Sequence, residues 1–459
     1  MGVTEDEVGC PGRAEMVGSS DLVDDNFNRF SSVKVGEKGL EEFSSMSGLF
    51  PNLQKSTIFF GSVHPVTRCE ILDLLPFKVG SLPLKYLGVP LISKRLGIGD
   101  CKCLVDKVKG KINCWRNKSL SYAGRLQLIN SVLSSMQVYW ASVYFLPQAI
   151  IKDIESLLMN FLWANDQKSR GKAKVAWKLV CRPKKNGGLG LRLLSVWNKV
   201  LLMKQVWKIV IQSDSIWWQW LNVVKLKGKN FWDVGHEYSD SWGWNQLLSL
   251  RDEMKNHMTT DQNGVAWWLT NDNKKKPFSS GQAWKDLGCN SPCVDWYNVV
   301  WFPQNTPKHA FIMWLAMLKR LTTQDRLKRW YPDQEFKCSF CGKQEDSHAH
   351  LFFKCDVTKQ IWENIKGMLV CKGLQNDLVH IVQDIARYQA AKDIRNILNI
   401  IVIGAVVYSI WMERNRRIFR KEVKVVDVIC KEVKRFIQDK LSSLIIKNTK
   451  NVKKSGRSM

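Results

Sequence analysis

The chain has 459 residues, 45% of them hydrophobic and 24% charged, which is long enough for two to four globular domains and excludes a low-complexity polymer. Its formal net charge is +27, and because residues 1–50 hold four basic and ten acidic side chains, the remainder carries +33. A field of this sign attracts polyanions, so a nucleic acid is the expected partner and an acidic membrane surface the alternative.

The thirteen cysteines are scattered and show no disulfide framework, which indicates a reducing intracellular compartment, nucleus or cytoplasm. The first residues are acidic where a secretory signal would be basic. The longest apolar run, Ile400–Met412, has only 13 residues and predicts a buried helix, so no membrane partner is expected.

The elements predicted from the sequence are mainly α-helices with a small β component. Residues 1–41 are rich in glycine, serine and acidic side chains without a sustained apolar period, so we expect a disordered acidic segment. Short apolar runs at Ser56–Phe60 and Leu84–Leu91 predict strands, the second ended or bent by Gly88 and Pro90.

Helical patterns follow from about residue 100. Cys103–Trp115 reads as one helix, Ser121 is a good N-cap for a second, and Pro147 opens a third with apolar residues at helical spacing. Trp197–Val210 continues the helical region. Residues 225–276 have clustered tryptophans among Gly, Asn and Asp, and we expect a linker there.

The C-terminal part contains a metal-ligand pattern. Cys338, Cys341, His350 and Cys355 form a Cys-x2-Cys-x8-His-x4-Cys cluster. Thiolates and imidazole at these short separations can close a tetrahedral shell around Zn²⁺, and a shell filled by four protein atoms indicates a structural ion. His348, two residues before His350, is the alternative imidazole ligand.

A basic, glycine-bearing stretch follows the third predicted helix. It contains Lys168, Arg170, Lys172, Lys174, Arg182, Lys184 and Lys185. These side chains are the predicted nucleic-acid contacts, with a solvated loop as the alternative interpretation. Most of the 21 tryptophans recur at helical spacing among Leu, Ile and Val, so we assign them to core packing rather than base stacking.

Several short motifs stand in a distinctive order. They are Ser45-Met46-Ser47-Gly48-Leu49, Lys85-Tyr86-Leu87-Gly88-Val89-Pro90-Leu91, Leu120-Ser121-Tyr122-Ala123-Gly124-Arg125, Phe161-Leu162-Trp163, Leu321-Thr322-Thr323, the cysteine cluster, and Trp411-Met412-Glu413-Arg414-Asn415. Together, over roughly residues 42–445, they resemble the C-terminal half of plant non-LTR (LINE-type) retrotransposon reverse transcriptases.

The resemblance implies a domain order. Residues 42–100 would be a palm remnant whose primer-grip-like hairpin includes Tyr86, Leu87 and Gly88, and residues 101–224 a helical thumb with connecting helices. After the linker at 225–276, residues 277–368 would be the zinc-binding domain of these elements. Residues 369–446 would be C-terminal helices and 447–459 a disordered basic tail.

A polymerase needs clustered carboxylates that hold two Mg²⁺ ions. The family takes one Asp from an early palm strand and two from a hairpin, and Asp24 and Asp25 lie near the expected place of that hairpin. They are candidates for a remnant, with an acidic surface loop as the alternative. Because the first aspartate has no counterpart, Mg²⁺ would matter only if an upstream catalytic palm were present.

Two functions from different classes follow. The first is a truncated retrotransposon-derived reverse transcriptase-like protein that binds RNA or DNA, with structural zinc and without polymerase catalysis. The alternative is a zinc-stabilised helical module that binds a protein. A third reading, an active enzyme completed by an upstream segment, depends on what precedes residue 1.

Overall fold

A computed structural model of the chain describes most of residues 38–444. The residues it leaves out are 1–37, 39–40, 51, 53–55, 61–62, 75–76, 93, 117–119, 164–172, 239, 263, 289–290, 329–330, 370–375, 389–393 and 445–459. The chain forms two compact units, Met1–Arg95 and Leu96–Met459. The described residues are mainly helical with small sheets, which confirms the predicted fold class. The predicted disorder at the two ends falls almost wholly outside the described residues.

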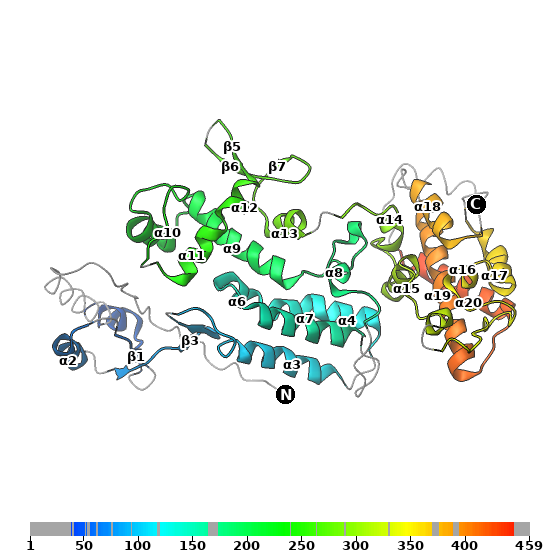
Figure 1. The fold of residues 1–459 in the computed structure, drawn as a ribbon, viewed down its shortest axis with the longest axis horizontal. Helices are drawn as coiled ribbons and strands as arrows, with labels where there is room; N and C mark the ends of the chain where they lie inside the picture. Colours follow the sequence, from blue (N-terminus) through cyan, green and yellow to red (C-terminus); the bar gives the residue numbers. More distant parts are fainter. Residues whose placement is uncertain are drawn as a thin grey trace. The chain divides into compact units, whose positions relative to one another are not determined.

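The first unit holds a short βαβ arrangement and a hairpin (Figure 1). Residues 41–47 are helical. The further elements are β1 (Thr57–Ile58), α2 (Pro65–Leu74), β2 (Lys78–Val79), β3 (Leu84–Tyr86) and β4 (Val89–Leu91). Strands β1 and β2 pair in parallel across the α2 crossover, whereas β3 and β4 pair antiparallel with Tyr86 opposite Val89.

The predicted primer-grip-like residues form the end of this hairpin. Tyr86 closes β3, and Leu87 and Gly88 are the two turn residues, both with positive φ (49° and 83°). Positive φ at both positions matches the right-handed twist of the flanking strands, and Gly88 accepts it without steric cost. Tyr86 and Leu87 are exposed.

The second unit begins with a helical region. Its elements are α3 (Lys102–Arg116), α4 (Tyr122–Leu128), η1 (Ile129–Leu133), α5 (Ser134–Met136), α6 (Val138–Val143), α7 (Gln148–Trp163), α8 (Trp177–Val180), η2 (Lys184–Asn186), α9 (Leu194–Val210), α10 (Ile216–Leu221) and η3 (Asn222–Leu226). The predicted start signals hold: the Ser121 hydroxyl accepts from the Gly124 N–H at 3.2 Å, and α7 starts directly after Pro147. Ile150, Ile154 and Phe161 of α7 are buried as their spacing indicated.

The stretch 225–276, expected to be a linker, is a folded part of the second unit. It carries α11 (Trp242–Ser249), α12 (Arg251–Lys255), β5 (Met258–Thr260), β6 (Ala266–Leu269) and β7 (Lys275–Lys276), followed by α13 (Ser280–Gly288). Strand β6 pairs antiparallel with both β5 and β7. These elements are too short to show a periodic apolar pattern, and buried tryptophans hold them instead.

Trp268 on β6 is the centre of this packing. Its side chain is fully buried, stacks on His257 with ring centroids 5.0 Å apart, and meets Phe278 edge-on. Its Nε1–H donates to Asp286 of α13 at 2.7 Å. The hydrogen bond between Trp268 and Asp286 therefore joins the β5–β6–β7 sheet to α13.

The C-terminal helices surround one long apolar helix. They are α14 (Tyr297–Val300), α15 (Pro307–Met317), η4 (Gln324–Leu327), α16 (His348–Leu351), α17 (Asp356–Lys366), α18 (Leu378–Tyr388), α19 (Ile394–Arg420) and α20 (Val426–Ser442). Figure 1 shows α19 running among α15, α18 and α20. The segment Asn396–Arg420 is long and apolar enough to cross a membrane by length and composition alone, but 67% of its most apolar window is buried inside the protein.

The packing of β6 gives a stability prediction. Replacing Trp268 with alanine opens a cavity and removes one of the donors to the buried Asp286 carboxylate, so the free energy of unfolding should fall by about 3–5 kcal/mol. Trp267→Ala is the matched control, because Trp267 is the adjacent residue of the strand and only half-buried. It should cost about 1 kcal/mol. Urea unfolding followed by circular dichroism measures both, and equal losses would show that the sheet is not anchored through Trp268.

Candidate metal centre

The first two ligands lie on a tight turn. The Cys338 N–H donates to the Gln344 carbonyl at 2.7 Å, and the Gly342 N–H donates to the Cys338 carbonyl at 2.8 Å. Lys337 and Glu345 pair as an antiparallel bridge, so the backbone folds back directly behind the turn. Gly342 has φ +66°, a conformation that favours glycine. The turn presents both sulfurs on one side; we call residues 336–346 the knuckle.

The other two ligands come from helix ends. Ser347 caps α16 by accepting from the His350 N–H at 3.3 Å, and the Cys355 N–H donates to the His350 carbonyl at 2.8 Å. Cys355 is the N-cap residue of α17. A helix N-terminus offers unpaired N–H groups and a positive dipole end, which suits a thiolate.

The four ligand atoms have the separations of a zinc shell. The Cys338 and Cys355 sulfurs are 3.8 Å apart, and the Cys341 sulfur lies 3.3 Å from His350 Nε2. All four atoms lie within 4.8 Å of one another. Two thiolates at about 2.3 Å from a tetrahedral zinc ion would be about 3.8 Å apart. The cluster therefore fits structural zinc.

His350 and not His348 supplies the imidazole. The Nε2 of His348 is 3.0 Å from the Leu321 carbonyl, and burial lowers the pKa of that imidazole. Its ring is thus a neutral donor to the backbone of the loop after α15. The sequence left His348 and His350 open as the imidazole ligand, and the contact of His348 with the Leu321 carbonyl leaves His350 as the ligand.

The buried sulfurs share a hydrogen bond. The Cys338 thiol donates to Cys355 and, together with the N–H groups of Thr358 and Val357, lowers the Cys355 pKa to about 5. The same shared proton and burial raise the pKa of Cys338. Backbone hydrogen bonds from Phe340 and Cys341 act in the opposite direction on the Cys338 pKa. Backbone hydrogen bonding thus favours the thiolate form of both sulfurs, which is the form that a metal ion would hold.

The other predicted site residues fall partly outside and partly inside the described part of the chain. Asp24, Asp25, Lys168, Arg170 and Lys172 lie outside the described residues.

Three of the remaining basic residues lie over aromatic rings. Lys174 is half-buried with its Nζ 5.0 Å from the centre of the Tyr122 ring, and burial lowers its pKa. Lys184 and Lys185 of η2 are exposed, with Nζ atoms 5.0 Å from the Trp301 ring and 6.0 Å from the Tyr297 ring. Arg182 is half-buried, and its carbonyl accepts from the Gly190 N–H.

Comparison with known proteins agrees with the metal centre. Residues 278–362, which contain the whole cluster, match the family described as zinc-binding in reverse transcriptase. This segment is therefore a reverse-transcriptase-associated zinc-binding domain.

Two Arabidopsis thaliana proteins are similar to parts of the chain. One carries the name of a ribonuclease H protein and is 36% identical over 129 residues, which is 28% of this chain and 21% of that protein's length. The other is an uncharacterized mitochondrial protein, 26% identical over 119 residues, which is 26% of this chain and 77% of its own length. The chain thus spans about a fifth of the ribonuclease H relative.

The contacts of the two histidines give a ligand test. His350→Ala removes one of the four ligand atoms, so zinc affinity should fall by more than the roughly 10–100-fold that outer-shell changes cause. His348→Ala should leave one zinc per chain. Metal analysis of the purified protein, and the visible absorption of its tetrahedral Co²⁺ form, report both variants. Loss of zinc in His348→Ala with retention in His350→Ala would reverse the assignment.

Proposed function

We propose that the chain is a plant retroelement-derived, reverse transcriptase-like protein that binds RNA or DNA, with zinc in a purely structural role. The match of residues 278–362 to a reverse-transcriptase zinc-binding family supports this proposal, as does a relative named as a ribonuclease H protein. The nucleus or cytoplasm is the compartment we propose for it.

The observation that carries nucleic-acid binding is the pair Lys184 and Lys185. Both are exposed, and within the described part of the chain neither ammonium has an acidic partner. Each lies over an aromatic ring of the zinc-binding segment, so the positive charge is held on a defined surface. Unpaired cations release counterions when they contact phosphates, which provides affinity without base specificity.

Arg182 and the sequence neighbours Lys168, Arg170, Lys172 and Lys174 extend this basic stretch. Of these, Lys174 is the least suited to a phosphate, because it is half-buried against Tyr122. We therefore assign the principal contacts to Lys184 and Lys185.

Catalysis by this chain is not part of the proposal. Two-metal polymerisation needs a cluster of carboxylates, and the sequence supplies only Asp24-Asp25 near the expected hairpin. Mg²⁺ would enter only with a complete palm. Tyr86, Leu87 and Gly88 are then a primer-grip-like turn without a polymerase centre of their own.

One observation favours the alternative, a module that binds protein. Along α10 and η3, five apolar side chains are exposed on one helical stretch: Ile216, Trp217, Trp220, Val223 and Val224. Such a stripe is unusual on a solvent-facing helix. Binding to a protein through it would depend little on salt, which separates the two functions experimentally.

Nucleic-acid binding predicts a salt dependence. The logarithm of the association constant of the full chain for a single-stranded oligonucleotide should fall linearly with the logarithm of salt concentration, and replacing Lys184 and Lys185 by alanine should reduce that slope by about 1.4. The control is Lys199→Ala with Lys366→Ala, which removes equal charge from lysines already paired with Glu253 and Glu363. Fluorescence anisotropy measures the slopes. Salt-insensitive binding, or none, would favour the protein-binding function.

The absence of catalysis has a separate test. With Mg²⁺, a primed RNA template and deoxynucleotides, the purified chain should give no primer extension above that of a protein-free sample, because three clustered carboxylates are required. Extension that disappears in Asp24→Asn would contradict this part of the proposal.

A further inference from the structure

The knuckle is also held by a side chain far along the sequence. Arg417, near the end of α19, donates from Nη1 to the Ser339 carbonyl at 3.3 Å, and its guanidinium lies 4.4 Å from the centre of the Phe340 ring. Ser339 and Phe340 are the two residues between the first two zinc ligands. Arg417 thus contacts the segment that connects Cys338 to Cys341.

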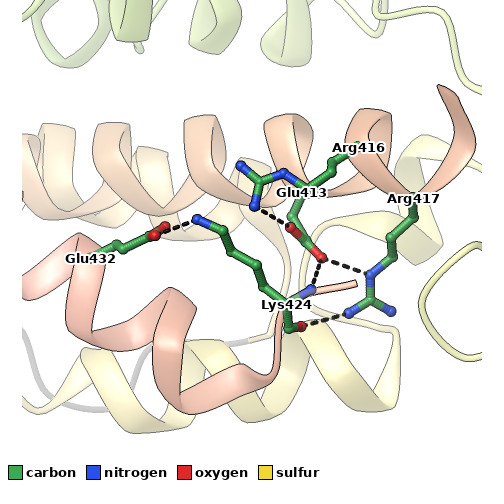
Figure 2. A network of polar contacts seen from close by, with 5 residues as sticks. All are labelled: Glu413, Arg416, Arg417, Lys424 and Glu432. Carbon is green, nitrogen blue, oxygen red and sulfur yellow. Dashed lines mark hydrogen bonds and ion pairs between the residues drawn. The ribbon is translucent and has the colours of Figure 1, made fainter. Parts of the chain in front are cut away.

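Arg417 is itself fixed in place by a network at the α19–α20 corner. Figure 2 shows Glu413 between Arg417 and the backbone of Lys424. The Arg417 Nε donates to Glu413 Oε1 at 3.0 Å, and the Lys424 N–H donates to the same oxygen at 2.8 Å. Arg417 Nη2 donates to the Lys424 carbonyl at 3.2 Å. Glu413 is almost completely buried, so its charge needs these partners.

A second contact joins α19 to the other arm of the knuckle. Asp346, fully buried, forms an ion pair with Arg414, which is 2% exposed. Asp346 also accepts from the Gln324 N–H at 2.9 Å, and its own N–H donates to the Phe336 carbonyl at 3.0 Å. Both arms of the turn that carries Cys338 and Cys341 are therefore attached to one helix.

We propose that Arg417 is a positioning residue for the zinc ion, and that α19 and the start of α20 are part of the metal module. Ser339 and Phe340 connect Cys338 to Cys341, so fixing the Ser339 carbonyl and the Phe340 ring fixes the turn that carries both ligands before metal binds. The family match ends at residue 362, well before Arg417. This inference rests on the zinc cluster and is independent of nucleic-acid binding.

Zinc binding and the ordering of the α19–α20 corner should each favour the other, because linked equilibria are reciprocal. A filled metal site stabilises the turn, whose Ser339 carbonyl accepts from Arg417. Arg417 in turn donates to the carbonyl of Lys424, which lies just before α20. A second path runs through Cys355, which caps α17, since Cys430 of α20 approaches the Ile361 carbonyl of α17. Zinc removal should therefore loosen the α19–α20 corner.

Zinc affinity of the full-length chain tests the role of Arg417. Arg417→Ala should weaken zinc binding by about 10–100-fold, as loss of an outer-shell partner does, and Arg417→Lys should recover part of it. Arg416→Ala is the matched control, because Arg416 is the neighbouring residue and pairs with the same Glu413 at 3.6 Å. It should change affinity by no more than about twofold. Competition with a chromogenic chelator gives the constants, and equal affinities in Arg417→Ala and Arg416→Ala would overturn the proposal.

Hydrogen exchange of the unmutated chain gives a second test that survives if Arg417→Ala fails to fold. On zinc removal by a chelator, the Lys424 amide and those at the start of α20 should lose protection. Amides of β6, such as Leu269 bonded to the His257 carbonyl, should not change. Unchanged exchange at Lys424 in the zinc-free protein would refute the coupling.

Discussion

The C-terminal module depends on three sulfurs and one imidazole brought within a single coordination shell. Cys338 and Cys355 are almost completely buried, and two thiolates so close together would repel strongly without a cation between them. The knuckle has little secondary structure of its own beyond one bridge. A structural zinc ion contributes on the order of 10 kcal/mol in small modules, which is comparable to the stability of a whole domain. The fold of residues 336–356 therefore depends on the ion.

The zinc-binding segment is packed against the helices that precede it. Trp314 of α15 donates its Nε1–H to the Gly187 carbonyl at 2.8 Å, and Phe311 stacks on Tyr122 of α4. The basic residues of η2 lie at the same junction, over rings contributed by α14 and its end. A cation held over an aromatic ring loses less conformational freedom on contacting a phosphate than a free lysine does. The domain junction and the proposed binding surface are thus one structural feature.

The parts of the molecule that depend on short-range pattern could be predicted from the sequence. Cys338, Cys341, His350 and Cys355 were recognisable because all four lie within 18 residues of chain, and α7 because its apolar period is long. The linker prediction for residues 225–276 was wrong, because strands of two to four residues show no period, and the buried Trp268 of β6 meets Phe278 and donates to Asp286, both beyond the segment. Arg417 was missed for a related reason: its contacts with Ser339 and Phe340 span 78 and 77 residues. The available signal was a glutamate and arginines directly after a long apolar run.

That signal also explains the length and composition of α19. Its apolar part is buried among the neighbouring helices, with Tyr408 stacked on His309 of α15, and its last turns carry the charges that reach the knuckle. The buried pair Asp346–Arg414 adds little net stability, because desolvation of two charges offsets most of their attraction. Separating them would leave both buried and unpaired, however, which costs about 3–5 kcal/mol. The pair therefore fixes the position of α19 along the knuckle, so that Arg417 reaches Ser339 and Phe340 between the first two zinc ligands.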